Sequence, residues 1–176
     1  MRAVRLISLA LALVLAVPLS ACSAQPGPSA WAAQVCTALS PWRSEIDSLT
    51  NRTQQQMTTK TTPGQAKENL ARLFDGAATA SEEARAGVER AGVPDVTNGD
   101  RIADGFVGSL AGIRDAYGHA RSGIQALATS PAKTFYDEVT KVVERLTTEY
   151  EKSSLDTTKL ESVELQQAFD SLPECQ

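Results

Sequence analysis

The chain has 176 residues, of which 42% are hydrophobic and 5% aromatic, and its formal net charge is −4. This length corresponds to one domain and is long enough to bury a sizeable core. The acidic balance argues against a nucleic-acid-binding protein, and it provides no electrostatic attraction to an anionic membrane surface.

The N-terminal segment is typical of an export signal. Arg2 and Arg5 precede an apolar run over residues 6–19, and no acidic residue occurs before Glu45. A basic start followed by a short apolar run characterises secretory signal peptides. The run is shorter than the roughly 20 apolar residues of a transmembrane helix. It ends in the sequence Leu19-Ser20-Ala21-Cys22.

That four-residue sequence resembles the lipobox of bacterial lipoproteins. The resemblance implies cleavage before Cys22, a diacylglyceryl group on its thiol and N-acylation of the new N-terminus. It divides the chain into a signal peptide (1–21), a lipidated Pro/Gly/Ser-rich linker (22–29) and one helical domain (30–176), and it implies a cell-envelope location on the extracytoplasmic face. Two or three acyl chains anchor a protein stably. The alternative is a soluble secreted protein whose cysteine lies there by chance.

The lipobox resemblance covers residues 1–22 and carries no information about activity. The remaining chain is similar in general layout to small helical envelope lipoproteins of bacteria. That likeness rests on one cysteine early in the first helix and another at the C-terminus, and it transfers no functional residue.

The two remaining cysteines, Cys36 and Cys175, form an even pair if Cys22 is lipidated. In an oxidising compartment we expect them to form a disulfide rather than stay as free thiols. The bridge would close nearly the whole mature chain, and the chain-entropy model values so large a loop at roughly 5 kcal/mol. No metal site is expected, because the cysteines lack paired CxxC spacing and the chain has one histidine.

The first helix is predicted from apolar residues at spacings of three and four. They are Trp31, Val35, Leu39, Trp42, Ile46 and Leu49. These residues form an apolar stripe along one side of the helix. Pro41 predicts either a kink or a new segment capped by Ser40. The stripe keeps the same spacing before and after Pro41, which favours one kinked helix. The polar segment 51–62 allows this helix to fray. Both tryptophans are expected in the core rather than in a pocket, with a partner for each indole N–H.

The second helix is expected to start at Pro63 with Thr62 as its cap, and to end before Gly92. Its stripe consists of Ala66, Leu70, Leu73, Ala77, Ala80, Ala84 and Val88. The stripe is mostly alanine in its second half, which lets a neighbouring helix approach closely. A loop over residues 93–99 follows.

The third helix carries the stripe Ile102, Phe106, Leu110, Ile113, Tyr117, Ala120, Ile124 and Leu127. It also contains Gly105, Gly108, Gly112, Gly118 and Gly123. Each glycine inside a helix costs about 0.5–1 kcal/mol relative to alanine, so the five need a reason. Close helix packing is favoured over flexibility or room for a ligand.

The fourth helix is expected after a Ser130 cap with Pro131 at its first position, and its stripe is Phe135, Val139, Val142, Leu146 and Tyr150. A short amphipathic helix over 163–172 follows, capped by Ser162 and stopped by Pro173. The predicted fold is all-α: an up-down antiparallel bundle of about four long helices plus a short C-terminal helix. Leu39, Leu73, Leu110 and Leu146 are expected to be buried in it.

Candidate chemical groups are few. His119 lies off the third stripe and is expected at the surface, and no nucleophile-elbow, zincin, Walker or dinucleotide motif accompanies it. The carboxylate pairs Glu82-Glu83 and Glu45 with Asp47 do not converge, because neighbouring helical residues point to different faces. Asn51-Arg52-Thr53 matches a glycosylation acceptor pattern. Because the lipobox at the N-terminal end of the chain resembles a bacterial one, we discount glycosylation there. The sequence therefore predicts no enzyme and no cofactor beyond the acyl groups on Cys22.

The preferred functional hypothesis is a non-enzymatic envelope lipoprotein that binds a partner protein or supports an envelope complex. The alternative is a small-molecule or lipid-binding module with an apolar pocket between the second and third helices. A contiguous exposed apolar patch would favour the first hypothesis. A closed apolar cavity of a few hundred cubic ångströms would favour the second.

Overall fold

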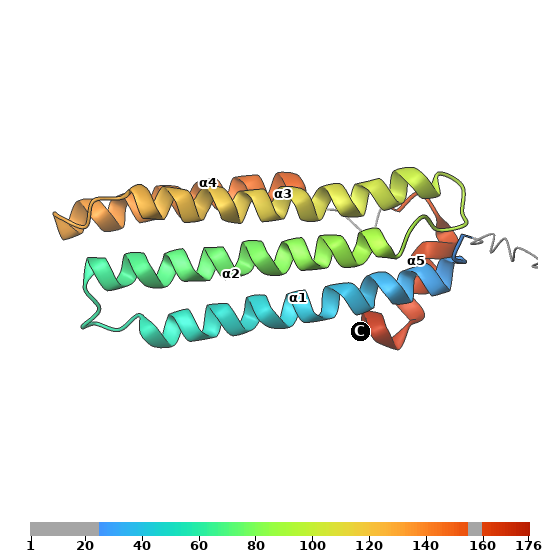
Figure 1. The fold of residues 1–176 in the computed structure, drawn as a ribbon, viewed down its shortest axis with the longest axis horizontal. Helices are drawn as coiled ribbons and strands as arrows, with labels where there is room; N and C mark the ends of the chain where they lie inside the picture. Colours follow the sequence, from blue (N-terminus) through green and yellow to red (C-terminus); the bar gives the residue numbers. More distant parts are fainter. Residues whose placement is uncertain (1–24, 155–159) are drawn as a thin grey trace, which may run out of the picture.

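A computed structural model describes residues 25–154 and 160–176, which leaves the lipobox and Cys22 outside the described residues. Four long helices follow one another in antiparallel order (Figure 1): α1 (Pro28–Gln56), α2 (Pro63–Arg90), α3 (Gly99–Ala126) and α4 (Ala132–Ser153). A short helix α5 (Val163–Ser171) and a 3-10 turn η2 (Pro173–Cys175) complete the chain. The described residues contain no strand, which confirms the predicted all-α helical bundle.

Local capping signals explain where two helices begin. The Thr62 hydroxyl accepts a hydrogen bond from the Gln65 backbone N–H at 3.3 Å, while the Gln65 side chain accepts one from the Thr62 N–H at 2.9 Å. This reciprocal pair is a capping box, and it satisfies N–H groups that have no partner within the helix. At α5, the Ser162 hydroxyl accepts a bond from the Leu165 N–H at 3.3 Å. The predicted caps Thr62 and Ser162 are therefore present.

Two helix starts differ from expectation. Helix α4 begins at Ala132, and Pro131 occupies the cap position in an extended conformation (ψ 149°), so Ser130 is not the cap. Helix α1 begins at Pro28, inside the predicted linker, since proline fits the first position of a helix. It continues through Pro41 as one helix, as the regular spacing of its apolar residues predicted, and it extends to Gln56.

The long helices form an open layer. Helix α2 packs between α1 and α3, and α3 packs between α2 and α4. Figure 1 shows α4 behind α3, on the side of α3 away from the viewer. Within the described residues α1 and α4 do not pack along each other, whereas α5 and η2 pack against α1. Besides α2, helix α1 therefore packs chiefly against the short elements α5 and η2, and α4 packs chiefly against α3.

This openness corrects the predicted core. Leu110 is buried, with 4% of its surface exposed, but Leu39, Leu73 and Leu146 are only half-buried. Leu39 belongs to α1 and Leu146 to α4, the two outer helices. Periodicity identified the apolar face of each helix correctly, but a face is fully buried only where another element covers it.

The buried side chains form two clusters. The first cluster joins α1, α2, α3 and α5 around Trp31, Val35, Val88, Ile102, Phe106, Leu110 and Leu165. The second cluster joins α2, α3 and α4 around Phe74, Ala120 and Ile124, and its surrounding residues, such as Leu73 and Leu146, are half-buried. The first cluster thus has the larger closed centre, although Leu39, Trp42 and Phe169 at its edge are also half-buried.

Four glycines inside α3 divide into two groups. A Cβ atom added at Gly112 would clash with Ser153 of α4, and one at Gly123 would lie 3.1 Å from a Val142 methyl group. At Gly108 and Gly118 an added Cβ would meet nothing within 4 Å. Close packing therefore explains Gly112 and Gly123, which let α4 approach α3, and does not explain the other two.

Candidate functional site

A groove of about 520 Å³ opens between α1, α3, the end of α4 and α5. We call it the inner groove. Its walls are mostly apolar or aromatic: Leu39, Trp42, Phe106, Leu110, Ile113, Tyr150 and Phe169. Arg43 and Asp170 add one charge of each sign to the lining. Ser109, Ser154 and Gln176 add further polar groups. The volume of the groove falls in the range typical of binding sites.

The two tryptophans have different roles. Trp31 is fully buried in the first cluster, and its indole N–H donates to the Gly92 carbonyl at 2.8 Å. Trp42 is half-buried in the groove wall, and its indole N–H donates to the Ser81 hydroxyl at 3.0 Å. The expected hydrogen-bond partners are present for both. The expectation of a core position holds for Trp31, while Trp42 also lines the groove.

Tyr150 contributes a half-buried aromatic ring to the groove. Its ring meets Tyr117 edge-on, with centroids 6.1 Å apart. Burial raises the pKa of Tyr150, and burial together with the Tyr150 neighbour raises the pKa of Tyr117 to about 12. Both phenols therefore stay protonated at neutral pH and contribute mainly ring surface.

Cys36 and Cys175 both line the inner groove. Their sulfur atoms lie 2.05 Å apart, at the bonding distance that the predicted disulfide requires. The bond joins the first half of α1 to η2 and so holds the C-terminal end of the chain beside Phe169. The bond therefore connects the groove wall formed by α5 and η2 covalently to the wall formed by α1.

An apolar strip continues from the groove along α4. Tyr136 and Val143 are exposed over 41% and 40% of their surface, which is high for large hydrophobic residues. Tyr136, Val143 and Tyr150 follow one another at intervals of seven, so they share one side of the helix. Because Tyr150 lines the inner groove, this strip extends its apolar wall toward the start of α4.

A second hollow, the outer groove, lies between α1 and α2 and has a volume of about 940 Å³. Small side chains such as Ala38 and Ala84 line much of it, together with Glu45, Glu83 and Arg90. Glu45 and Glu83 lie on different helices, so the sequence could not predict that both line the same groove. Glu45 is paired with Arg52 at 2.9 Å, so this groove holds no isolated pair of facing carboxylates.

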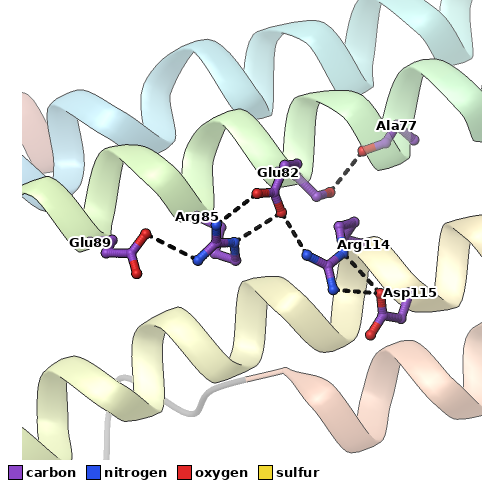
Figure 2. Close-up of polar contacts among 7 residues, drawn as sticks. Ala77, Glu82, Arg85, Glu89, Arg114 and Asp115 are labelled. Carbon is purple, nitrogen blue, oxygen red and sulfur yellow. Dashed lines mark hydrogen bonds and ion pairs between the residues drawn. The ribbon is translucent and has the colours of Figure 1, made fainter.

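Glu82 belongs to an ionic network between α2 and α3 rather than to an acid–base site (Figure 2). Its carboxylate accepts bonds from Arg85 at 2.7 and 2.9 Å and from Arg114 of α3 at 2.7 Å. These hydrogen bonds, first from Arg85 and then from Arg114, lower the pKa of Glu82 from its ordinary 4.5 to about 2. Glu82 therefore stays ionised at neutral pH, where it joins two helices.

His119 lies at the surface, with 68% of its side chain exposed, as expected. Its Nδ1 atom is 2.9 Å from the Glu149 carboxylate, which links α3 to α4. Asp47 is exposed on α1, apart from Glu83, and Asn51 is exposed near the end of that helix. None of these residues lines the inner groove.

In the described part of the chain, no three histidine, cysteine or acidic side chains come close enough together to hold a metal ion. Among the helices over residues 25–154 and 160–176, none is sufficiently long and apolar to cross a membrane. Comparison with protein-family models, with curated proteins and with solved structures finds no match.

Proposed function

We propose that this chain is a lipid-anchored, extracytoplasmic protein without catalytic activity, and that its helical domain binds a partner protein of the cell envelope. The inner groove is the proposed binding site. The anchor follows from the lipobox resemblance at Leu19-Ser20-Ala21-Cys22. The acyl chains on Cys22 would hold the acidic domain at a membrane that its own charge does not favour.

The observation that carries the proposal is the half-exposed aromatic lining of the groove. Trp42, Tyr150 and Phe169 all line it without being fully buried. Aromatic side chains are enriched at the centre of protein interfaces, where their large surfaces lose contact with water. The exposed strip of Tyr136 and Val143 adds apolar surface on the α4 side.

A small-molecule or lipid carrier remains the second candidate. The volume of about 520 Å³ and the apolar lining favour it. Against it, the groove is partly open to solvent, whereas carriers of small apolar ligands usually bury most of the ligand surface. An open groove instead suits a ligand that brings its own polar surface, as a protein does.

Photo-crosslinking in living cells tests the proposal. A photoreactive amino acid is placed at Leu39 in the groove and, as a matched control, at Thr148 on an exposed part of α4. We expect a discrete protein adduct from Leu39 and none of the same mass from Thr148. Native mass spectrometry of the purified protein would detect a retained lipid. Finding a stoichiometric lipid and no protein adduct would favour the carrier instead.

The anchor is tested separately. Cys22→Ala should prevent lipidation, so the protein should leave the membrane fraction or accumulate as unprocessed precursor. Cys36→Ser is the control, because it removes a cysteine outside the lipobox and should leave membrane attachment unchanged. A Cys22→Ala variant with the mature mass and fractionation of the unchanged protein would refute the lipobox interpretation.

A further inference from the structure

The chain already holds a short amphipathic helix of its own against the apolar side of the bundle. Helix α5 is nine residues long and contributes Leu165 and Ala168 to the buried core. Phe169 stacks on Phe106 with centroids 5.7 Å apart and meets Trp31 edge-on at 6.1 Å. With Leu172, these residues follow the spacing i, i+3/i+4, i+7 of a helix that binds through one face.

The inner groove begins where the binding surface of α5 ends. Phe169 and Phe106 take part in α5 packing and also line the groove, so the two surfaces are continuous. The α1 wall extends from Cys36 to Arg43, which corresponds to about 10 Å along a helix. That length is two helical turns, enough to contact residues i and i+7 of a second short helix.

The charges in the lining distinguish a peptide from a lipid. Arg43 and Asp170 line the groove beside the polar residues Ser109, Ser154 and Gln176, and the two carry charges of opposite sign. An amphipathic helix can place charged residues of its polar face beside both. Both side chains are exposed, and a bare acyl chain offers a partner to neither of them.

We propose that the inner groove binds a short amphipathic helix of the partner protein, with apolar residues at the spacing found in α5. This inference rests on the proposed partner-binding function and specifies the chemistry of the partner. It is a helix-in-groove interaction in which α5 and the bound helix lie side by side on one apolar surface.

The probe is a labelled, hydrocarbon-stapled peptide with the sequence of residues 162–172, because an unconstrained peptide of this length is barely helical in water. Binding to the full mature protein with its disulfide intact is followed by fluorescence anisotropy. We expect saturable binding that weakens at least tenfold when Leu165 and Phe169 of the peptide are replaced by glutamate. Absence of saturable binding would overturn the proposal.

Protein variants locate the binding site. Leu39→Glu places a charge in the groove wall, and Arg43→Glu reverses an exposed charge without touching the core. Both should weaken binding, while Thr148→Glu on α4 should not. Thermal melting checks that Leu39→Glu still folds, and Arg43→Glu supplies the test if it does not. Binding that neither variant affects would contradict the assigned site.

Further measurements show which occupant the groove takes. Loss of hydrogen-exchange protection at Leu165 and Ala168 on adding the peptide would mean that it replaces α5, which would overturn the proposal. A cellular adduct at Leu39 together with no peptide binding would keep the partner-binding function and reject an α5-like helix. A change in oligomeric state at high concentration, lost with Leu39→Glu, would identify a second copy as occupant and also reject this partner.

Discussion

The first cluster and the second cluster have similar residue types but differ in how completely they are closed. In the first, Trp31, Val35 and Leu165 have no exposed surface, because α5 covers the side that α1, α2 and α3 leave open. In the second, the fully buried centre is smaller and comprises Phe74, Ala120 and Ile124. Half-buried residues surround both centres, such as Trp42 and Phe169 at the first and Leu73 and Leu146 at the second. The positions of the apolar residues therefore determine which side of a helix can be buried. The element that packs on that side determines how much of its surface is buried.

The covering element of the first cluster is held by a covalent bond as well as by packing. A chain end normally frays unless it is docked. Here the Cys36–Cys175 bond joins η2 to α1 across a sequence separation of 139 residues. The second cluster has no such connection, since its outer helix α4 packs chiefly against α3.

Breaking the disulfide should give the largest effect. Cys36→Ser and Cys175→Ser should each lower the free energy of unfolding by about 5 kcal/mol, the value of the chain-entropy model for so long a loop, because the unfolded chain loses a long-range constraint. The double variant should be no less stable than either single one, as the same bond is lost. Urea unfolding measures the stabilities, and additive losses would show that the two residues act independently.

Truncating the centre of the first cluster should follow in size. Trp31→Ala removes a fully buried indole that contacts Phe106 and Phe169 and bonds to the Gly92 carbonyl. The expected loss is about 3–5 kcal/mol, which urea unfolding can measure. A loss below about 1 kcal/mol would mean that the centre of this cluster is not closed in solution.

The same truncation at the edge of the second cluster should cost less. Leu146→Ala removes a half-buried side chain of α4, so only part of its surface changes environment. We expect a loss of about 1–2 kcal/mol, below the 2–5 kcal/mol typical of fully buried leucines. A loss equal to that of Trp31→Ala would remove the distinction between the clusters.

The α3 glycines should respond in opposite directions. Gly112→Ala places a methyl group against Ser153 and should destabilise the protein by about 1 kcal/mol, since α4 must shift. Gly108→Ala meets open space and should stabilise it by about 0.5–1 kcal/mol through helix propensity. Thermal unfolding of the matched pair decides this, and equal shifts of the two melting temperatures would contradict close packing at Gly112.

The smallest expected effect is a pH dependence at the α2–α3 contact. The pKa of Glu82 is lowered to about 2 in the folded protein, so its contribution is present above pH 4.5 and is lost as the pH falls toward 2. Glu82→Gln should flatten the stability profile between about pH 5 and 2, while Glu83→Gln, at a residue that lines the outer groove, should not. Urea unfolding across this pH range measures the stability of both variants. Identical stability profiles for the two variants would refute the assignment of this pH dependence to Glu82.

Local sequence signals determined the helices and several of their ends. The stripe of α1 keeps its period across Pro41, and Thr62 and Ser162 cap the helices that follow them, because these effects act within a few residues. The pairing of Cys36 with Cys175 was also predicted, from the cysteine count and the expectation of an oxidising compartment. Such arguments need no knowledge of which helices become neighbours.

Only the tertiary structure decided what covers each apolar face. Leu39, Leu73 and Leu146 match the pattern of core residues as well as Leu110 does, yet they remain half-buried, because α1 and α4 do not pack along each other. The inner groove exists for the same reason, and its walls come from helices far apart in the sequence. Periodicity specifies a direction around one helix axis, whereas a groove depends on the distances between helices, and those are set by long-range packing.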